Sequence, residues 1–308
     1  MGKKLNIGGQ AIIEGLMIRG PKYNVIGIRK KKKIILKKEK IKQRKGKFYK
    51  LPIVRGFYNL VDMLVLGMKS LMWSADQQAE AEEEKITKKE MTFSVVFAIL
   101  FGIGLFVLLP YVATNFIGYY EETQPMLFNL IDGIIRIAIF ITYILVISLL
   151  KDVKVLFQYH GAEHKAIHCY EHGKELTLKN VKKYTTLHPR CGTAFIMIVL
   201  VISILVFSVL PPIIMFFFPN FINMHVFPRK IILFFLRLSL LPLIAGIAYE
   251  FLKLSAKYEK NSLMKIAIWP GLFLQKITTK EPTFKQSEVA IAVTKKVLQM
   301  EKKAPFKM

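Results

Sequence analysis

Four long apolar segments constrain the fold of this chain more than any other feature of its sequence. Residues 91–120 and 192–227 contain no Asp, Glu, Lys or Arg. Residues 130–150 and 231–249 contain few charged residues, namely Asp132, Arg136 and Arg237. Because a helix needs roughly 20 apolar residues to cross the hydrocarbon core of a bilayer, each segment predicts a transmembrane helix. The alternative is a soluble protein with buried core helices. It explains the sequence less well, because the chain has four apolar runs of this length.

Lysine and arginine lie almost entirely outside these segments. The chain is 53% hydrophobic and yet has a formal net charge of +25. All but four of its 46 Lys and Arg residues fall in residues 1–90, 151–192 and 252–308. By the positive-inside rule these three parts lie on the cytoplasmic side, and an even number of crossings places both termini there. The sequence therefore predicts a mainly α, multi-pass protein of the cytoplasmic (plasma) membrane with about four transmembrane helices.

The same basic charge bears on the binding partners. A strongly basic protein can bind nucleic acid, but here the basic residues adjoin the apolar segments. Attraction to anionic lipid, worth about 1 kcal/mol for each basic residue near the surface, accounts for that placement. We therefore expect membrane lipid as a partner, other membrane proteins as further candidates, and no nucleic acid.

The N-terminal part is predicted to contain two units. Residues 1–52 form a small cytoplasmic α+β segment, in which residues 23–28 and 34–36 are expected to pair as a β-hairpin across a basic turn. Residues 53–90 form the second unit. Their apolar positions over 53–74 have helical spacing but are interrupted by charges, which predicts an amphipathic helix on the inner membrane surface, followed by an acidic linker.

The remainder divides into a membrane domain and a tail. Residues 91–251 are predicted to be a four-helix membrane domain that includes a cytoplasmic, histidine-rich loop, residues 151–192. Residues 252–308 are predicted to be a cytoplasmic C-terminal tail. In that tail Trp269-Pro270-Gly271 indicates a turn, and residues 286–303 indicate a helix.

The stretch YHGAEHKAIHCYEH, residues 159–172, is the strongest functional signal. Four of the six histidines recur in it at every fourth residue: His160, His164, His168 and His172. Residues four apart lie on one helix face, so two neighbouring imidazoles can bind one ion. The pattern H-x-x-E-H formed by His160, Glu163 and His164 is that of inverzincins. It predicts two zinc ligands, His160 and His164, with Glu163 as the catalytic base.

A second cluster, HPRC at residues 188–191, supplies an imidazole and a thiol three residues apart. His188 and Cys191 would complete a tetrahedral site with the two histidines of the first motif. Four protein ligands would make the zinc (Zn²⁺) site closed and structural, whereas three would leave a position for water and permit catalysis. The sequence leaves both open. Cys169 and Cys191 lie where thiols stay reduced, so they are expected as ligands or plain thiols rather than as a disulfide.

Simpler explanations exist for these residues. The histidine face could be a solvated helix surface, and His168 is expected to be a surface residue. Glu163 could equally pair with Arg190 or Lys165. Glu250, at the inner end of the fourth apolar segment, is a weaker candidate for a carboxylate ligand.

The block GGQAIIEGLMIRGP, residues 8–21, brackets a polar trio between turn-forming glycines. The trio consists of Gln10, Glu14 and Arg19. It resembles a pocket wall, and Glu14 or Gln10 is expected to face the histidine cluster. The alternative is a short capped helix that docks on the membrane domain.

Charged residues inside the apolar segments are functional candidates in a membrane. Asp132 and Arg136 lie four residues apart and are expected to pair on one helix face. Arg237 is expected either to extend towards the outer surface along its helix or to mark a substrate path.

The chain resembles the YqhQ-like family of bacterial multi-pass membrane proteins. The resemblance is carried by GGQAIIEGLMIRGP, YHGAEHKAIHCYE, HPRCGTAF, WPGLFLQKITTKEPT and EVAIA, and so extends over essentially the whole chain. It implies an integral membrane protein with a suspected metal dependence and no settled activity. It supplies no catalytic mechanism.

Three functions remain open at this point. The leading hypothesis is a zinc-dependent hydrolase acting on a membrane-associated substrate, with Glu163 as base. The second is a non-enzymatic assembly or regulatory factor with a structural metal site. The third, a transporter, has only Arg237 and the Asp132–Arg136 pair to support it.

Overall fold

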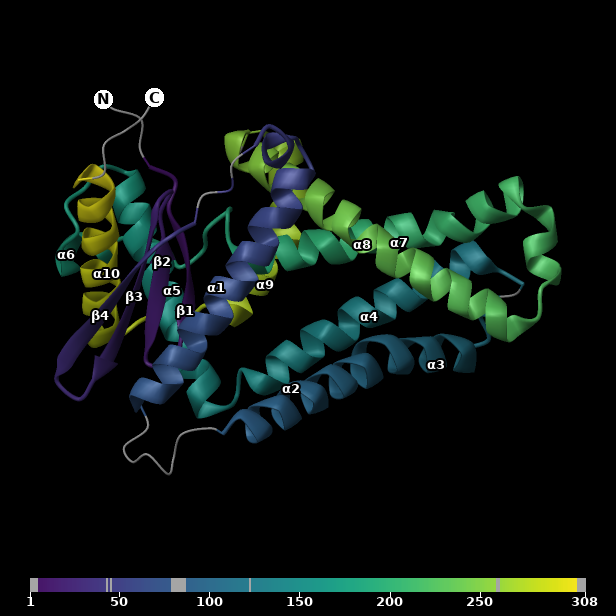
Figure 1. Ribbon diagram of the computed structural model, residues 1–308, viewed down its shortest axis with the longest axis horizontal. Helices are drawn as coiled ribbons and strands as arrows, with labels where there is room; N and C mark the ends of the chain where they lie inside the picture. The colour runs from purple at the N-terminus through teal and green to yellow at the C-terminus, as the bar shows by residue number, and fades with distance from the viewer. Residues whose placement is uncertain are drawn as a thin grey trace.

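The four apolar segments form four long helices in the computed structural model, which describes residues 5–42, 44, 46–78, 87–121, 123–258 and 261–303 (Figure 1). Each is long and apolar enough to cross a membrane, which confirms the predicted fold class. These candidate membrane helices are, in chain order, Lys89–Phe116, Pro125–Ile147, Gly192–Phe217 and Val226–Ser255. The first consists of α2 (Lys88–Ile103), a π-helical turn (Gly104–Leu108) and α3 (Leu109–Phe116). The others are α4 (Pro125–Ile147), α7 (Gly192–Phe217) and α8 (Val226–Lys257).

The surface of α2 argues against the soluble alternative. Phe93, Phe97 and Phe101 stack along this helix, with consecutive ring centroids 6.5 and 6.2 Å apart, and all three are exposed. A contiguous row of exposed aromatic rings is unfavourable in water but is compatible with lipid. The side chains of this helix therefore fit a membrane better than an aqueous surface.

A four-stranded antiparallel sheet precedes the helices. Its strands are β1 (Gly8–Ile12), β2 (Gly15–Arg19), β3 (Tyr23–Lys30) and β4 (Lys33–Lys40), paired in that order. The predicted hairpin is confirmed as β3–β4, and Lys31 in its turn has φ 55°. The hairpin β1–β2 replaces the short helix considered for residues 8–21. Glu14 lies in its turn with φ 49°.

Helices cover both faces of this sheet. Because successive strand residues point to opposite faces, Leu16, Ile18 and Val25 pack against α5 (Lys151–Glu171) and α10 (Phe284–Lys303). Met17, Ile26 and Ile28 on the other face pack towards side chains of α1 (Val54–Gln78). Each of these six side chains is fully buried and contributes about 1.5–3 kcal/mol by leaving water. We call β1–β4 with α1, α5 and α10 the sheet unit; it lies at one end of the candidate membrane helices (Figure 1).

The helix α1 connects the two parts of the molecule. The predicted amphipathic helix is present, and it packs the partly buried Met63, Leu66 and Leu71 against the sheet while Leu64 and Met68 stay exposed. At its other end it packs on α8. Residues 79–86, most of the expected acidic linker, lie outside the described residues.

The C-terminal region folds back onto both parts. The predicted turn at Trp269-Pro270-Gly271 is wrong, because these residues lie within α9 (Ser262–Thr278). A Cβ atom on Gly271 would lie 2.7 Å from Ala194, so α9 and α7 approach too closely there for any side chain. This tight packing holds α9 in a helix despite the backbone bond that Pro270 cannot make. The predicted final helix is present as α10. Elsewhere in the chain three short helical elements occur: Phe48–Lys50, Leu178–Val181 (α6) and Pro219–Asn223.

A polar cluster joins the candidate membrane helices far from the sheet unit. The guanidinium of Arg237 on α8 donates to Glu121 and to Asn129, both at 2.8 Å. Arg136 donates to Asp132 at 2.6 Å, which confirms the pairing expected on α4. Arg237 therefore binds neighbouring segments instead of extending alone to a surface.

Replacing Arg237 by leucine is expected to destabilise the protein by about 2 kcal/mol. The substitution leaves a nearly buried Glu121 carboxylate without its cation, and breaking a fully buried pair costs about 3–5 kcal/mol. The Arg237 side chain is 28% exposed, which reduces the effect. Thermal unfolding in detergent micelles should show a lower Tm, while Lys253→Leu at an exposed site of the same helix should leave it unchanged. An unaltered Tm for Arg237→Leu would contradict this role.

Candidate metal centre

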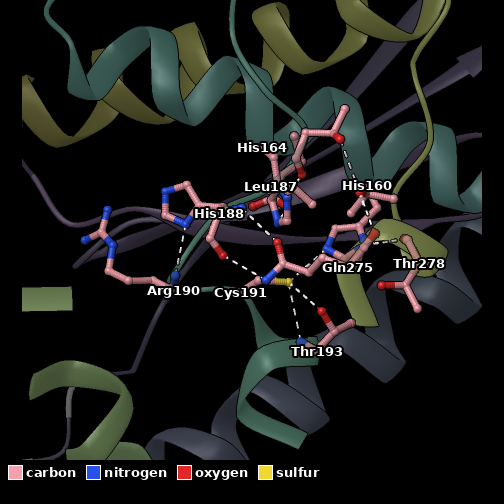
Figure 2. A network of polar contacts seen from close by, with 12 residues as sticks. His160, His164, Leu187, His188, Arg190, Cys191, Thr193, Gln275 and Thr278 are labelled. Carbon is pink, nitrogen blue, oxygen red and sulfur yellow. Dashed lines mark hydrogen bonds and ion pairs between the residues drawn. The ribbon is translucent and has the colours of Figure 1, made fainter. Parts of the chain in front are cut away.

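Three of the four predicted metal ligands come together where α5 meets the start of α7. His160 and His164 lie one turn apart on α5, and Cys191 immediately precedes α7 (Figure 2). The Nε2 atom of His160 is 3.2 Å from the Sγ atom of Cys191. One ligand atom from each of the three residues lies within 4.8 Å of the other two. These residues could therefore hold a metal ion.

The predicted fourth ligand, His188, belongs to a different group. Its Nε2 is 3.2 Å from Glu171 Oε2, and its Nδ1 accepts a hydrogen bond from the backbone of Arg190 at 3.2 Å. The Gln275 side chain holds the His188 backbone from α9, with bonds of 2.8 and 2.9 Å (Figure 2). His168, Glu171 and His188 form a second group that could hold a metal, although Arg190 already pairs with Glu171.

Backbone carbonyls fix both imidazoles of the first group. His160 Nδ1 donates to the carbonyl of Thr278 at 2.9 Å, and His164 Nδ1 donates to that of Thr186 at 2.5 Å. In metal sites such bonds orient the ring and select the tautomer in which the other nitrogen is the ligand. Both Nε2 atoms are thereby available on the side that faces Cys191.

The position of Cys191 favours its thiolate. The residue caps the N-terminus of α7, where Sγ accepts from the backbone N–H of Thr193 at 3.4 Å and lies 3.1 Å from its hydroxyl. Burial raises the pKa of the thiol, but His160 and His164 outweigh burial and hold that pKa well below its usual value. Burial lowers the pKa of His160, but the Cys191 thiolate, Glu163 and the Thr278 carbonyl together raise it to about 9. A divalent cation would replace the proton that this pair shares.

Glu163 lies beside the three ligands and is buried. Its Oε2 atom is 3.7 Å from His164 Nε2. A Cβ atom on Gly9 would come within 3.1 Å of its Oε1, so the glycine of β1 makes room for this carboxylate. The alternative pairings are not observed, since Arg190 pairs with Glu171 and Lys165 pairs with Glu281.

The centre opens onto a cavity of about 620 Å³ between the sheet unit and the candidate membrane helices. Its wall includes the metal-ligand side chains and Glu163, the end of the β1–β2 hairpin, the start of α1, and the nearest ends of α7 and α8. Those last two helices contribute Phe195, Tyr249 and Leu252. A substrate could reach the centre through this space.

The polar trio of residues 8–21 is only partly at the cavity. Arg19 lines it and lies 3.9 Å from Asp62. Gln10 instead packs against Gly67 of α1, because it points to the opposite sheet face from Gly9. Glu14 accepts from the hydroxyl of Tyr159 at 3.3 Å in the turn at the other end of the hairpin.

Two other candidates also lie away from the first group. Glu250 accepts from Arg55 through both carboxylate oxygens, one of them at 2.6 Å. His168 is half-buried rather than a surface residue, and its Nε2 donates to the carbonyl of Leu187 at 2.8 Å. Burial, together with the neighbouring histidines, lowers the pKa of His168 to about 4, so its ring is neutral at physiological pH.

Sequence reasoning missed the residues that support the ligands. Gln275 and Thr278 on α9 hold His188 and His160, and Thr186 holds His164. Gln275 and Thr278 both fall in the block WPGLFLQKITTKEPT that carried part of the family resemblance. Membership of that block was therefore the sequence feature that could have identified Gln275 and Thr278 as residues that hold the metal ligands.

Comparison with known proteins finds one family and one curated relative. The model of a family described as "Protein of unknown function (DUF1385)" matches residues 51–300. "Uncharacterized protein YqhQ" of Bacillus subtilis (strain 168) is 31% identical over 316 residues, which cover 96% of this chain and 92% of that protein. No solved structure gives a significant match. The matched region includes α5, the start of α7 and α9, and hence all the residues of the first metal group.

Proposed function

This chain belongs to the DUF1385 family, and for this member we propose a zinc-dependent hydrolase that acts on a membrane-associated substrate at the cytoplasmic face of the plasma membrane. The orientation is supported by the basic residues, which are concentrated in the sheet unit and on the same side of the candidate membrane helices. The positive-inside rule assigns that side to the cytoplasm.

One observation carries the catalytic part of the proposal: three ligands converge while the fourth candidate is held elsewhere. His160, His164 and Cys191 form one group, whereas His188 bonds to Glu171. Nitrogen and sulfur donors suit zinc, and three protein ligands with an open position are typical of catalytic zinc sites. The open position would face the cavity.

Glu163 is the residue best placed to act as general base. Zinc bound at such a site supplies a water molecule whose pKa is lowered towards 7. The buried Glu163 carboxylate, 3.7 Å from His164 Nε2, lines the same cavity and would accept the proton that this water gives up. The Thr278 and Thr186 carbonyls keep both imidazoles in one orientation throughout.

The non-enzymatic alternative is also favoured by a specific observation. The first group joins α5 of the sheet unit to α7, and His160 is bonded in addition to the end of α9. A metal there would fasten the sheet unit to the candidate membrane helices even without catalysis. The transporter alternative is weaker, because Arg237, Glu121, Asp132 and Arg136 pair among themselves.

Replacing Glu163 by glutamine is expected to abolish turnover and to leave the zinc content unchanged. Loss of a general base costs roughly 10²–10⁴ in rate. The purified proteins would be incubated with bacterial membrane vesicles, the products followed by mass spectrometry and the zinc measured by elemental analysis. Equal product formation by Glu163→Gln would contradict the catalytic role. Bound zinc without any turnover in the unaltered protein would favour the structural alternative.

A further inference from the structure

The cavity beside the metal centre has a basic wall. Six basic residues line it: Arg19, Lys42, Arg44, Lys50, Arg55 and Arg190. The acidic lining residues are Asp62 and Glu163. Glu171 and Glu250 do not line the cavity but pair with Arg190 and Arg55, and even when they are included there are six cations to four carboxylates. The space beside the proposed catalytic base is therefore suited to an anion.

Arg19 is the cation whose charge is least compensated. Its nearest carboxylate within the described residues is Asp62 at 3.9 Å. Asp62 is itself bonded to Arg44, with Oδ1 at 2.7 Å and Oδ2 at 3.4 Å, so one carboxylate serves two guanidinium groups. The Arg19 side chain is only 19% exposed, and its burial lowers its pKa. A largely buried guanidinium is stabilised when an anion accepts hydrogen bonds from its donors. Here the neighbouring carboxylate is that of Asp62, which Arg19 shares with Arg44.

Arg19 lines the same cavity as the metal group, at the open end of the β1–β2 hairpin. Arg19 pairs with Gly8 across the β1–β2 ladder and points to the α1 face of the sheet, whereas the next residue, Gly9, contacts Glu163 on the α5 face. Neighbouring strands are about 4.8 Å apart. A Cβ atom on Gly8 would meet no described atom within 4 Å, so the space in front of this pair is open. Because Arg19 and the metal group line the same cavity, a ligand that extends past the open end of the hairpin can contact both.

Part of the lining is apolar and comes from the candidate membrane helices and α1. It includes Phe195 at the start of α7 and Leu252 near the end of α8, together with Met63 and Leu60 from α1. A ligand with an anionic head and an apolar remainder matches this combination of basic and apolar lining residues. Arginine binds phosphate through paired N–H donors, and several cations around one cavity suit a phosphate better than a singly charged group.

We propose that this cavity binds a phosphate-bearing headgroup through Arg19, so that the substrate of the proposed hydrolase is a phosphate ester held beside the metal centre. The assignment of this ligand as substrate rests on the proposed function, whereas its binding does not. The phosphate could belong to a lipid of the inner leaflet or to a water-soluble ester. The chemistry that Arg19 recognises is the same in both.

Binding of dihexanoyl phosphatidic acid to the detergent-purified Glu163→Gln protein tests this proposal without turnover. Native mass spectrometry or calorimetry should show binding that Arg19→Gln weakens by about tenfold or more, since a charge-assisted pair is lost. Arg19→Lys keeps the charge without the paired donors and should bind the lipid at an intermediate level. This second variant keeps the test valid if Arg19→Gln folds poorly. Lys37→Gln, on β4 and outside the cavity lining, is the matched control and should bind normally.

Two further ligands, inorganic phosphate and dihexanoylglycerol, test where the phosphate comes from and whether phosphate is needed for binding. Inorganic phosphate that fails to displace the lipid points to a lipid headgroup, and effective displacement points to a soluble ester. Dihexanoylglycerol, which lacks phosphate, should not bind. Equal affinity for it, or an Arg19→Gln protein that binds like the unaltered one, overturns the proposal. Zinc content measured on the same samples separates phosphate binding from the proposed hydrolase function. A protein that holds zinc but does not bind the phosphate ligand contradicts only the phosphate proposal. A protein that binds the phosphate ligand but holds no zinc contradicts only the hydrolase proposal.

Discussion

Zinc binding is expected to fall by at least about 100-fold when Cys191 is replaced by alanine. Loss of a residue that only supports a metal ligand already costs roughly 10–100-fold in affinity, and Cys191 is itself one of three converging ligands. It is also the one whose pKa is held low, so that it contributes the negative charge of the site. Elemental analysis of protein prepared without chelators should find zinc in the unaltered chain and none in this variant.

The chain provides a matched control for that experiment. Cys169 is also a buried thiol of the same region, but its Sγ atom lies near the carbonyl of Glu175 at 3.4 Å and away from the metal group. Cys169→Ala should therefore retain zinc, and His160→Ala should lose it. His188→Ala distinguishes the two forms of the site. Retained zinc agrees with three ligands and an open position, and complete loss would indicate a closed four-ligand site.

The candidate site was predictable where its geometry is local. His160, Glu163 and His164 lie within one helical turn, and the 3.6-residue period of a helix fixes their relation without any tertiary contact. His188 was not predictable in the same way. Its orientation depends on Gln275, which lies 87 residues further along the chain and holds both backbone groups of His188.

The same contrast holds for the fold. The candidate membrane helices follow from the length of charge-free sequence that a bilayer requires, and no partner needs to be known. The hairpin β1–β2 has five-residue strands that contain three glycines, so its strand signal is weak. Its stability comes from burial of Leu16 and Ile18 against α5 and α10, and the latter is formed by the other end of the sequence. Such a long-range contact cannot be deduced from local pattern.

Gly161 shows how closely the fold and the metal centre depend on each other. It lies between His160 and Glu163 on α5, where an added Cβ atom would be 2.1 Å from the carbonyl oxygen of Lys280 and 3.1 Å from a methyl group of Thr186. The segment that carries Lys280 cannot move away cheaply. Its backbone N–H donates to the carbonyl of Phe157 at 2.9 Å, and the nearby Thr278 carbonyl accepts from His160.

Replacing Gly161 by alanine is therefore expected to destabilise the protein by about 3 kcal/mol, and replacement by valine by more. Overpacking costs about 1–3 kcal/mol when side chains can adjust, and here the clash is with backbone. The gain of about 1 kcal/mol in helix propensity offsets only part of it. The zinc content should fall together with the Tm, because retreat of residues 278–280 releases the His160 ring. Gly102→Ala on α2, where a Cβ atom would meet no described atom within 4 Å, is the matched control; it keeps the gain in helix propensity without the clash and should not lower the Tm. If Gly161→Ala unfolds at the same temperature as the unaltered protein and keeps its zinc, the close approach of α5 to residues 278–280 does not hold the metal centre in place.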